Sequence, residues 1–120
     1  MDRLRNRADF LRAARGIRRV AQSLTLEACR SPEDAARAGM LRVGFTATRK
    51  LGNAVVRNRA KRRLRAAAAA VLPLSGLAGN DYVLVARPGT LSRAFPDLLE
   101  DLAVALAAAH LRLDKTKGHP

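Results

Sequence analysis

The residues of this sequence that could do chemistry are cations, and they are densest between Arg49 and Arg65. This segment reads RKLGNAVVRNRAKRRLR and holds eight of the 23 lysines and arginines in the chain. No aspartate or glutamate occurs between Asp34 and Asp81. Such a segment repels itself unless an extended anion neutralises it, so its chemistry is phosphate binding. Its arginines favour recognition over charge coating, because a guanidinium grips phosphate with two donors and stacks on bases.

The whole chain has the charge of a nucleic-acid-binding protein. Its 120 residues carry a formal net charge of +13, and 48% of them are hydrophobic. That hydrophobic fraction is too high for a disordered basic tail, so the charge belongs to a folded body. The length suits a single domain over residues 1–120, with a flexible polar tail over residues 114–120. We expect the partner to be RNA.

Side-chain catalysis has little support in the sequence. Enzymes that cleave phosphodiesters use carboxylates to hold metal or a histidine to move protons, and the basic segment has neither. His110, His119 and Cys29 are too scattered for a zinc site, and no phosphate-loop or nucleophile-elbow motif is present. We therefore expect no catalytic residue, no metal site, no cofactor and no small-molecule substrate on this chain.

The expected location is the cytoplasm. A single cysteine, Cys29, cannot form an intramolecular disulfide and suits a reducing compartment. No apolar run approaches the roughly 20 residues needed to span a bilayer, so no membrane partner is expected.

The elements that must position the cations begin with a short helix. Asn6 as its cap and Gly16 as its stop predict a helix over residues 7–15. Residues 20–30 alternate in polarity and predict one half-buried strand or a pair of short ones. Residues 31–39 read as a polar connection.

Residues 41–48 alternate and predict a strand with one buried face. The buried face holds Leu41, Val43, Phe45 and Ala47. The other face could contact a ligand, and it presents Arg42, Gly44, Thr46 and Thr48.

The basic segment itself predicts a turn and then a helix. Gly52 and Asn53 form the turn, Asn53 caps the helix, and the helix ends at about Leu72, before Pro73. Its cations flank an apolar stripe of Val56, Ala60, Leu64, Ala67 and Val71.

A strand over residues 81–87 and a packing helix over residues 96–113 complete the predicted fold. The class is α+β, in the order αβββαβα, with helices packed on a small, mostly antiparallel central sheet.

In these residues the sequence resembles the protein subunit of bacterial ribonuclease P. The RNR signature of that family, KKxGxAVxRNRxKRxxR, is closely matched over 17 residues. The similarity to this family extends to the start of the chain at Arg7, Asp9 and Phe10, to the LRVGF and DYVLVAR strands, and to the last helix. The matching signature positions are Arg49, Lys50, Gly52, Ala54, Val55, Arg57, Asn58, Arg59, Lys61, Arg62 and Arg65.

The resemblance implies a left-handed βαβ crossover, an exception to the usual hand. It also implies that the RNR region binds a large catalytic RNA, which cleaves precursor tRNA with magnesium and releases the 5′ leader. The RNA-binding residues are then Arg49, Lys50, Gly52, Asn53, Arg57, Asn58, Arg59, Lys61, Arg62 and Arg65.

The resemblance further implies a leader-binding cleft between the first helix and the sheet. Phe10 corresponds to an aromatic residue that contacts the leader, although core packing explains it nearly as well. Two other aromatic positions of the family are replaced, near Ala14 and Glu27. Leader binding here then depends more on polar residues, and the cleft set is Phe10, Arg12, Arg42, Thr46, Thr48 and Arg87, supported by Lys61 and Arg65.

Two other functions fit the sequence. One is a structural RNA-binding protein of ribosomal type. The other is nonspecific coating of nucleic acid, which would tolerate any order of the basic residues between Arg49 and Arg65.

Overall fold

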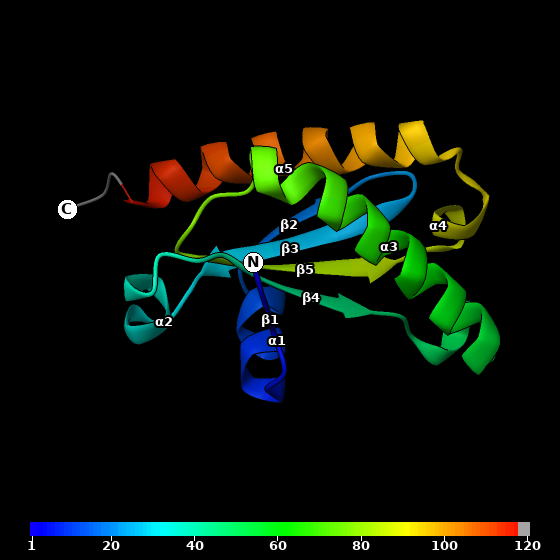
Figure 1. Ribbon diagram of the computed structural model, residues 1–120, viewed down its shortest axis with the longest axis horizontal. Coiled ribbons are helices and arrows are strands. Elements are labelled where there is room, and N and C mark those ends of the chain that lie inside the picture. Colours follow the sequence, from blue (N-terminus) through cyan, green and yellow to red (C-terminus); the bar gives the residue numbers. More distant parts are fainter. Residues whose placement is uncertain (118–120) are drawn as a thin grey trace.

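A five-stranded mixed sheet forms the centre of the computed structural model, which describes the backbone of residues 1–117 and the side chains of residues 1–114 (Figure 1). The strand order is β1-β4-β5-β3-β2, with parallel β1–β4 and β4–β5 pairs and antiparallel β3–β5 and β2–β3 pairs. The longest pairing, β3 with β5, is antiparallel. The strands are β1 (Asp2–Arg3), β2 (Ile17–Val20), β3 (Leu24–Arg30), β4 (Arg42–Thr46) and β5 (Asn80–Ala86).

The two long helices cover one face of this sheet, and the first helix lies on the other (Figure 1). Short helical segments occupy the connections. The helices are α1 (Arg7–Ala14), α2 (Glu33–Arg37), the 3₁₀ helix η1 (Arg49–Leu51), α3 (Ala54–Ser75), α4 (Pro88–Ser92) and α5 (Phe95–Lys117). None of the described helices is long and apolar enough to cross a bilayer.

The main core lies between the sheet and the two long helices. The strands contribute alternate residues to it, because successive side chains of a strand point to opposite faces. The predicted stripe of α3 is confirmed at Ala60, Leu64, Ala67 and Val71, which are buried, whereas Val56 at its start is half-buried. A smaller cluster under α1 joins Leu4, Ala13, Cys29 and Val83, with Phe10 and Val85 packed against it.

The crossover from β4 through α3 to β5 is left-handed, as the family resemblance implies. In Figure 1 both strands point to the right, β5 lies above β4, and α3 passes above and in front of them. This hand is rare because a right-twisted strand normally returns through a right-handed connection. Its effect is to lay α3 along the face that α5 also covers.

Several predicted boundaries are wrong. The predicted alternative of two short strands is confirmed for residues 20–30, but the first of them, β2, begins earlier, at Ile17, and ends at Val20, whereas β3 runs from Leu24 to Arg30. Residues 31–39 contain α2, whose start signal was Pro32 followed by two acidic residues. β1 and α4 are too short to produce a periodic pattern.

The predicted stop before Pro73 is also wrong, since α3 continues to Ser75. A proline in the last turn removes only one hydrogen bond, and the Gly76 N–H still donates to the Leu72 carbonyl at 2.8 Å. The last helix extends beyond the predicted residue 113 to Lys117, and the remainder of the expected tail, residues 118–120, lies outside the described residues.

Candidate RNA interface

The start of α3 is built by three consecutive features of the sequence. η1 ends at Leu51, and Gly52 then adopts a φ of 155°, in a region that only glycine enters easily. A Cβ at this position would lie 2.9 Å from Cγ1 of Val56. Asn53 caps the helix as predicted, because its Oδ1 accepts the Val56 N–H at 3.0 Å. The turn and cap therefore fix the direction in which the basic helix leaves the sheet.

Beyond this start, α3 presents its cations to solvent. Asn58, Arg59, Arg62 and Arg65 are exposed, and Arg57 and Lys61 are half-buried. Within the described part of the chain, no ion pair involves any residue between Arg49 and Arg65. The Nε of Arg57 is buried without a hydrogen-bond partner. These cations therefore flank the buried stripe of α3, as the helical spacing predicts, and they have no carboxylate partner among the described residues.

Arg63 is the exception among the basic residues of α3. Its guanidinium donates to the carbonyl oxygens of Leu91 at 3.0 Å and Arg93 at 2.6 Å, so it fastens the connection between α4 and α5 to α3. The ring of Phe95 lies 6.0 Å from it. Arg63 follows Val56 by seven residues, about two helical turns, and therefore lies on the same side of the helix. This spacing could have predicted from the sequence that Arg63 points inward.

On the opposite face of the sheet, Phe10 of α1 packs directly on Gly44 of β4. A Cβ built on Gly44 would lie 2.5 Å from the Phe10 ring. Phe10 remains half-buried and also belongs to the small cluster beneath α1. The packing interpretation of Phe10 is therefore confirmed, and the half-buried ring keeps part of its surface exposed, so its contact with a leader stays a prediction.

Arg12 and Arg42, two of the predicted cleft residues, are held by carboxylates inside the protein. Arg42 donates to both oxygens of Asp81, and Arg12 donates to Oδ2 of Asp81 at 2.8 Å and Oδ1 of Asp9 at 2.7 Å. The Ser31 hydroxyl donates to Oδ1 of Asp81 at 2.6 Å. Asp81 is fully buried, whereas the Arg12 side chain stays 38% exposed. The network joins α1 to the ends of β4 and β5.

The electrostatics of Asp81 follow from these contacts. Burial alone would raise the pKa of this carboxyl, but hydrogen bonds from Arg42, Ser31 and Arg12 outweigh it and hold the pKa below its ordinary value. Asp81 therefore stays ionised and keeps both arginines in place.

The other predicted cleft residues lie on or beside the same open face. Thr46 is half-buried, in register with Val85, and Thr48 is exposed just before η1. The half-buried Arg87 begins α4, where its backbone N–H donates to Oγ1 of Thr90 at 3.0 Å. Glu27 faces this region through its register partner Val83, and burial raises the pKa of its carboxyl against the effect of Arg18.

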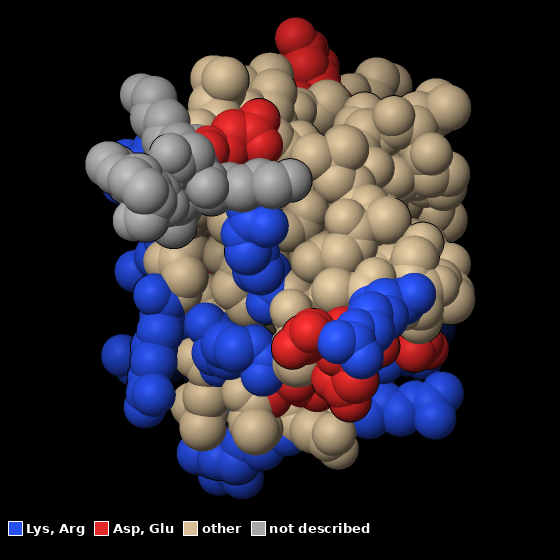
Figure 2. All heavy atoms as spheres, turned by 90° about the vertical axis from the view of Figure 1, so that its left-hand side faces the viewer, with Lys and Arg blue, Asp and Glu red and all other residues tan. Residues whose placement is uncertain are grey.

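The basic elements have no acidic side chains of their own. Neither η1 nor α3 contains one. Figure 2 looks at the other end of the molecule, which carries α2, and shows acidic residues lying among arginines there. Among the residues that the structure describes, no group of three or more histidine, cysteine and acidic side chains could hold a metal ion.

Comparison with known proteins gives a consistent result. Residues 1–110 match the family model described as Ribonuclease P. The ribonuclease P protein component of Ruegeria pomeroyi is 55% identical over 108 residues, covering 89% of this chain and 85% of that protein. The Caulobacter vibrioides component is 45% identical over 114 residues, covering 95% and 74%.

Solved structures agree with the sequence relatives. The RNase P protein of Staphylococcus aureus superposes with a TM-score of 0.72 at 25% identity, covering 91% of this chain and 95% of that one. The RNase P protein of Thermotoga maritima gives a TM-score of 0.70 at 25% identity, covering 88% and 96%.

The fold and the uncompensated basic helix define a small α+β RNA-binding protein. The chain belongs to the ribonuclease P protein family. Its function is that of a ribonuclease P subunit in tRNA processing.

Proposed function

We propose that this protein binds the RNA subunit of ribonuclease P through η1 and the exposed side of α3, and the 5′ leader of precursor tRNA through the face under α1. The observation that carries the proposal is the run of cations on α3 without a carboxylate partner among the described residues. A row of cations along a helix is neutralised by a row of phosphates, and the backbone of a folded RNA supplies such a row.

The RNA subunit would perform the hydrolysis, with magnesium held by RNA. This assignment is supported by the residue types on α3. An arginine keeps its proton near neutral pH and an asparagine does not titrate, so the surface can bind phosphate but cannot exchange protons with the reacting groups. The contribution of the protein is then electrostatic: it lowers the repulsion between RNA strands that magnesium would otherwise have to screen.

The leader surface consists of the strand positions that α1 leaves open. Thr46 of β4 and its register partner Val85 of β5 are half-buried on this face, and the half-buried Phe10 ring offers part of a face for stacking a base. Arg12 and Arg42 serve this surface as positioning residues, because their guanidinium groups are already bonded to Asp81 and Asp9. Lys61 and Arg65, which the sequence added to the cleft set, lie on α3, across the sheet from α1, so they are not part of this surface.

Reconstitution with the cognate RNA subunit tests this function. We expect the wild-type protein to permit cleavage of precursor tRNA at low magnesium and to favour precursor over mature tRNA. The double variant Arg59→Gln/Arg62→Gln should lose both effects. The double variant Glu33→Gln/Arg37→Gln on the distant α2 is the control and should keep them. If wild-type protein changed neither the magnesium requirement nor the preference for precursor, the proposal would be wrong.

The same assay separates specific docking from coating. A variant with the basic residues between Arg49 and Arg65 reordered keeps the net charge but loses the match between helix and RNA. Specific docking predicts loss of activity in this variant, and coating predicts none.

A further inference from the structure

A small cavity lies on the α3 side of the sheet, at the edge formed by β1 and β4. It has a volume of about 170 Å³ and is lined by Met1, Arg3, Val43, Phe45 and Arg65. Pockets for drug-sized ligands occupy roughly 300–1,000 Å³, so this cavity suits one flat ring and not a larger cofactor. It lies on the face opposite to Phe10, and is therefore separate from the proposed leader surface.

The walls of the cavity combine an aromatic ring with cations. The Arg65 guanidinium lies 5.8 Å from the centroid of the half-buried Phe45 ring. Arg3 is exposed and follows the same edge, because it pairs in register with Val43. In the described part of the chain, neither Arg3 nor Arg65 forms an ion pair with a carboxylate. Two free cations therefore flank an aromatic floor.

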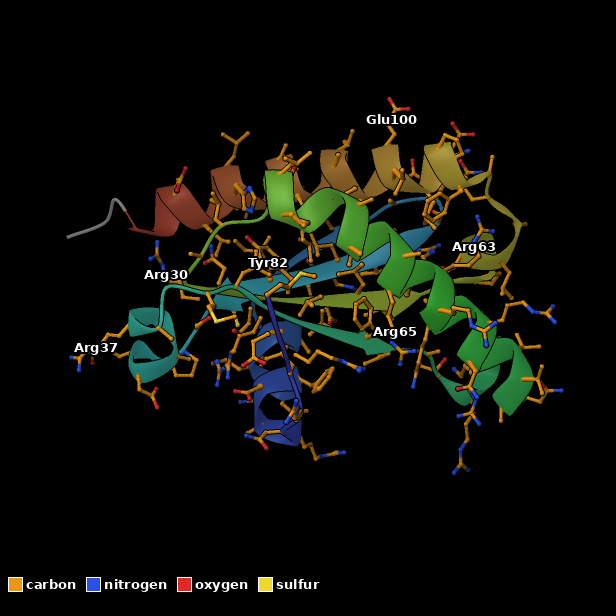
Figure 3. The ribbon with its side chains drawn as sticks, viewed as in Figure 1. Arg30, Arg37, Arg63, Arg65, Tyr82 and Glu100 are labelled. Atoms are coloured by element: carbon orange, nitrogen blue, oxygen red, sulfur yellow. The ribbon has the colours of Figure 1, made fainter. Side chains whose placement is uncertain are left out.

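Arg63 and Phe95 show that the arrangement at Phe45 is different from a purely structural pair. Their separation of 6.0 Å is similar, but the Arg63 guanidinium is occupied by the carbonyls of Leu91 and Arg93. Figure 3 shows Arg63 directed toward α4 and Arg65 toward β4. Only the Arg65 pair borders the cavity and has donors left for a ligand.

We propose that this cavity binds one unpaired nucleotide of RNA, with the base against Phe45 and Val43 and the phosphate between Arg3 and Arg65. An aromatic ring stacks any base, and arginine adds both charge and a stacking plane. The inference rests on the proposed role of α3 in RNA binding and names a second contact beside it. The nucleotide can come from the RNA subunit or from the precursor, since both offer the same chemistry.

Conservative variants of Phe45 test the site in the reconstituted holoenzyme. Phe45→Leu keeps an apolar side chain but removes the ring, and should weaken RNA binding by about five-fold or more, the lower end for loss of one stacked base. Phe45→Tyr keeps the ring and should retain the affinity. Phe95→Leu is the matched control and should bind as the wild type does. Arg3→Gln should lower the salt slope of binding by about 0.7 to 0.9.

Ultraviolet cross-linking identifies the source of the nucleotide. The RNA subunit and the precursor are labelled in separate arms, and trypsin places Phe45 in the peptide of residues 43–49, apart from every other aromatic residue. A cross-link at Phe45 itself, distinguished from one at Thr46 or Thr48 by sequencing the peptide, supports the site and names its source. If Phe45→Leu and Phe95→Leu bind equally and neither arm labels Phe45, the site is wrong. Normal magnesium dependence in that case would leave the proposed function standing.

Discussion

Arg42 holds Asp81 through two parallel hydrogen bonds, from Nε to Oδ1 at 2.8 Å and from Nη2 to Oδ2 at 2.7 Å. The two residues are also partners in the register of β4 and β5. Because Asp81 further binds Arg12 of α1, this pair connects the helix to the two strands on either side of the left-handed crossover. The main role of the Arg42–Asp81 pair is therefore to hold α1, β4 and β5 together.

Removing Arg42 should destabilise the protein strongly. Arg42→Ala leaves the buried Asp81 with only Ser31 and Arg12 as partners, and we expect a loss of about 2–4 kcal/mol in the free energy of unfolding. Urea denaturation measures this loss. Arg37→Ala breaks the exposed pair with Glu33, whose side chains are 75% and 81% exposed, and should cost less than about 1 kcal/mol. Equal losses in the two variants would contradict the assignment.

Acid should weaken the fold through Asp81. The pKa of this carboxyl is lower in the folded state than in the unfolded state, so on acidification the unfolded chain takes up the proton first. The contribution of Asp81 to the free energy of unfolding is complete above its pKa in the unfolded chain, about 3.9. It is lost as the pH falls through the lower pKa of the folded state. Urea midpoints measured at a series of acidic pH values should fall less steeply for Asp81→Asn than for wild type. Asp34→Asn on the exposed α2 should keep the wild-type slope.

Two asparagines of the basic segment should behave differently. Asn53→Ala removes the cap of α3 and should lower the free energy of unfolding by about 1 kcal/mol. Asn58→Ala lies on the exposed side of the helix, where alanine is a better helix former than asparagine, and should leave thermal stability equal or slightly higher. RNA affinity should nevertheless fall in Asn58→Ala. An unchanged affinity would remove Asn58 from the interface.

Arg62 and Arg63 are neighbours with the same charge, but their substitutions should have different effects on RNA binding and on stability. Arg62→Gln should reduce the salt slope of RNA binding by about 0.7 to 0.9, because it removes one phosphate contact. Arg63→Gln should leave the slope unchanged and lower the melting temperature, because its guanidinium is bonded to Leu91 and Arg93. Binding titrations at several salt concentrations check the first result, and thermal unfolding checks the second. A slope reduced equally in both variants would place Arg63 on the RNA.

Periodic patterns predicted the parts of the fold that bury residues at regular spacing. The stripe through Ala60 and Leu64 predicted how α3 packs, and the alternation around Val43 predicted β4. The cap at Asn53 was also predicted, because it depends on neighbours in the sequence. The charge of α3 followed from the same local evidence.

Contacts between distant segments could not be predicted in this way. Arg42 was read as a cation facing a ligand, because nothing near it in the sequence shows that Asp81, 39 residues later, would lie beside it. The same holds for Arg12. Phe45 looked like an ordinary core residue, because the cavity beside it requires β1, a strand of two residues with no pattern of its own.

The absence of a side chain at Gly44 sets the spacing between α1 and the sheet. The Phe10 ring rests on the backbone of β4 only because no side chain separates them, and even one methyl group at residue 44 would lie 2.5 Å from that ring. Gly44→Ala would therefore lift the helix and change the width of the open face without replacing any group that touches RNA. The room at the proposed leader surface is therefore set in part by the missing side chain of residue 44.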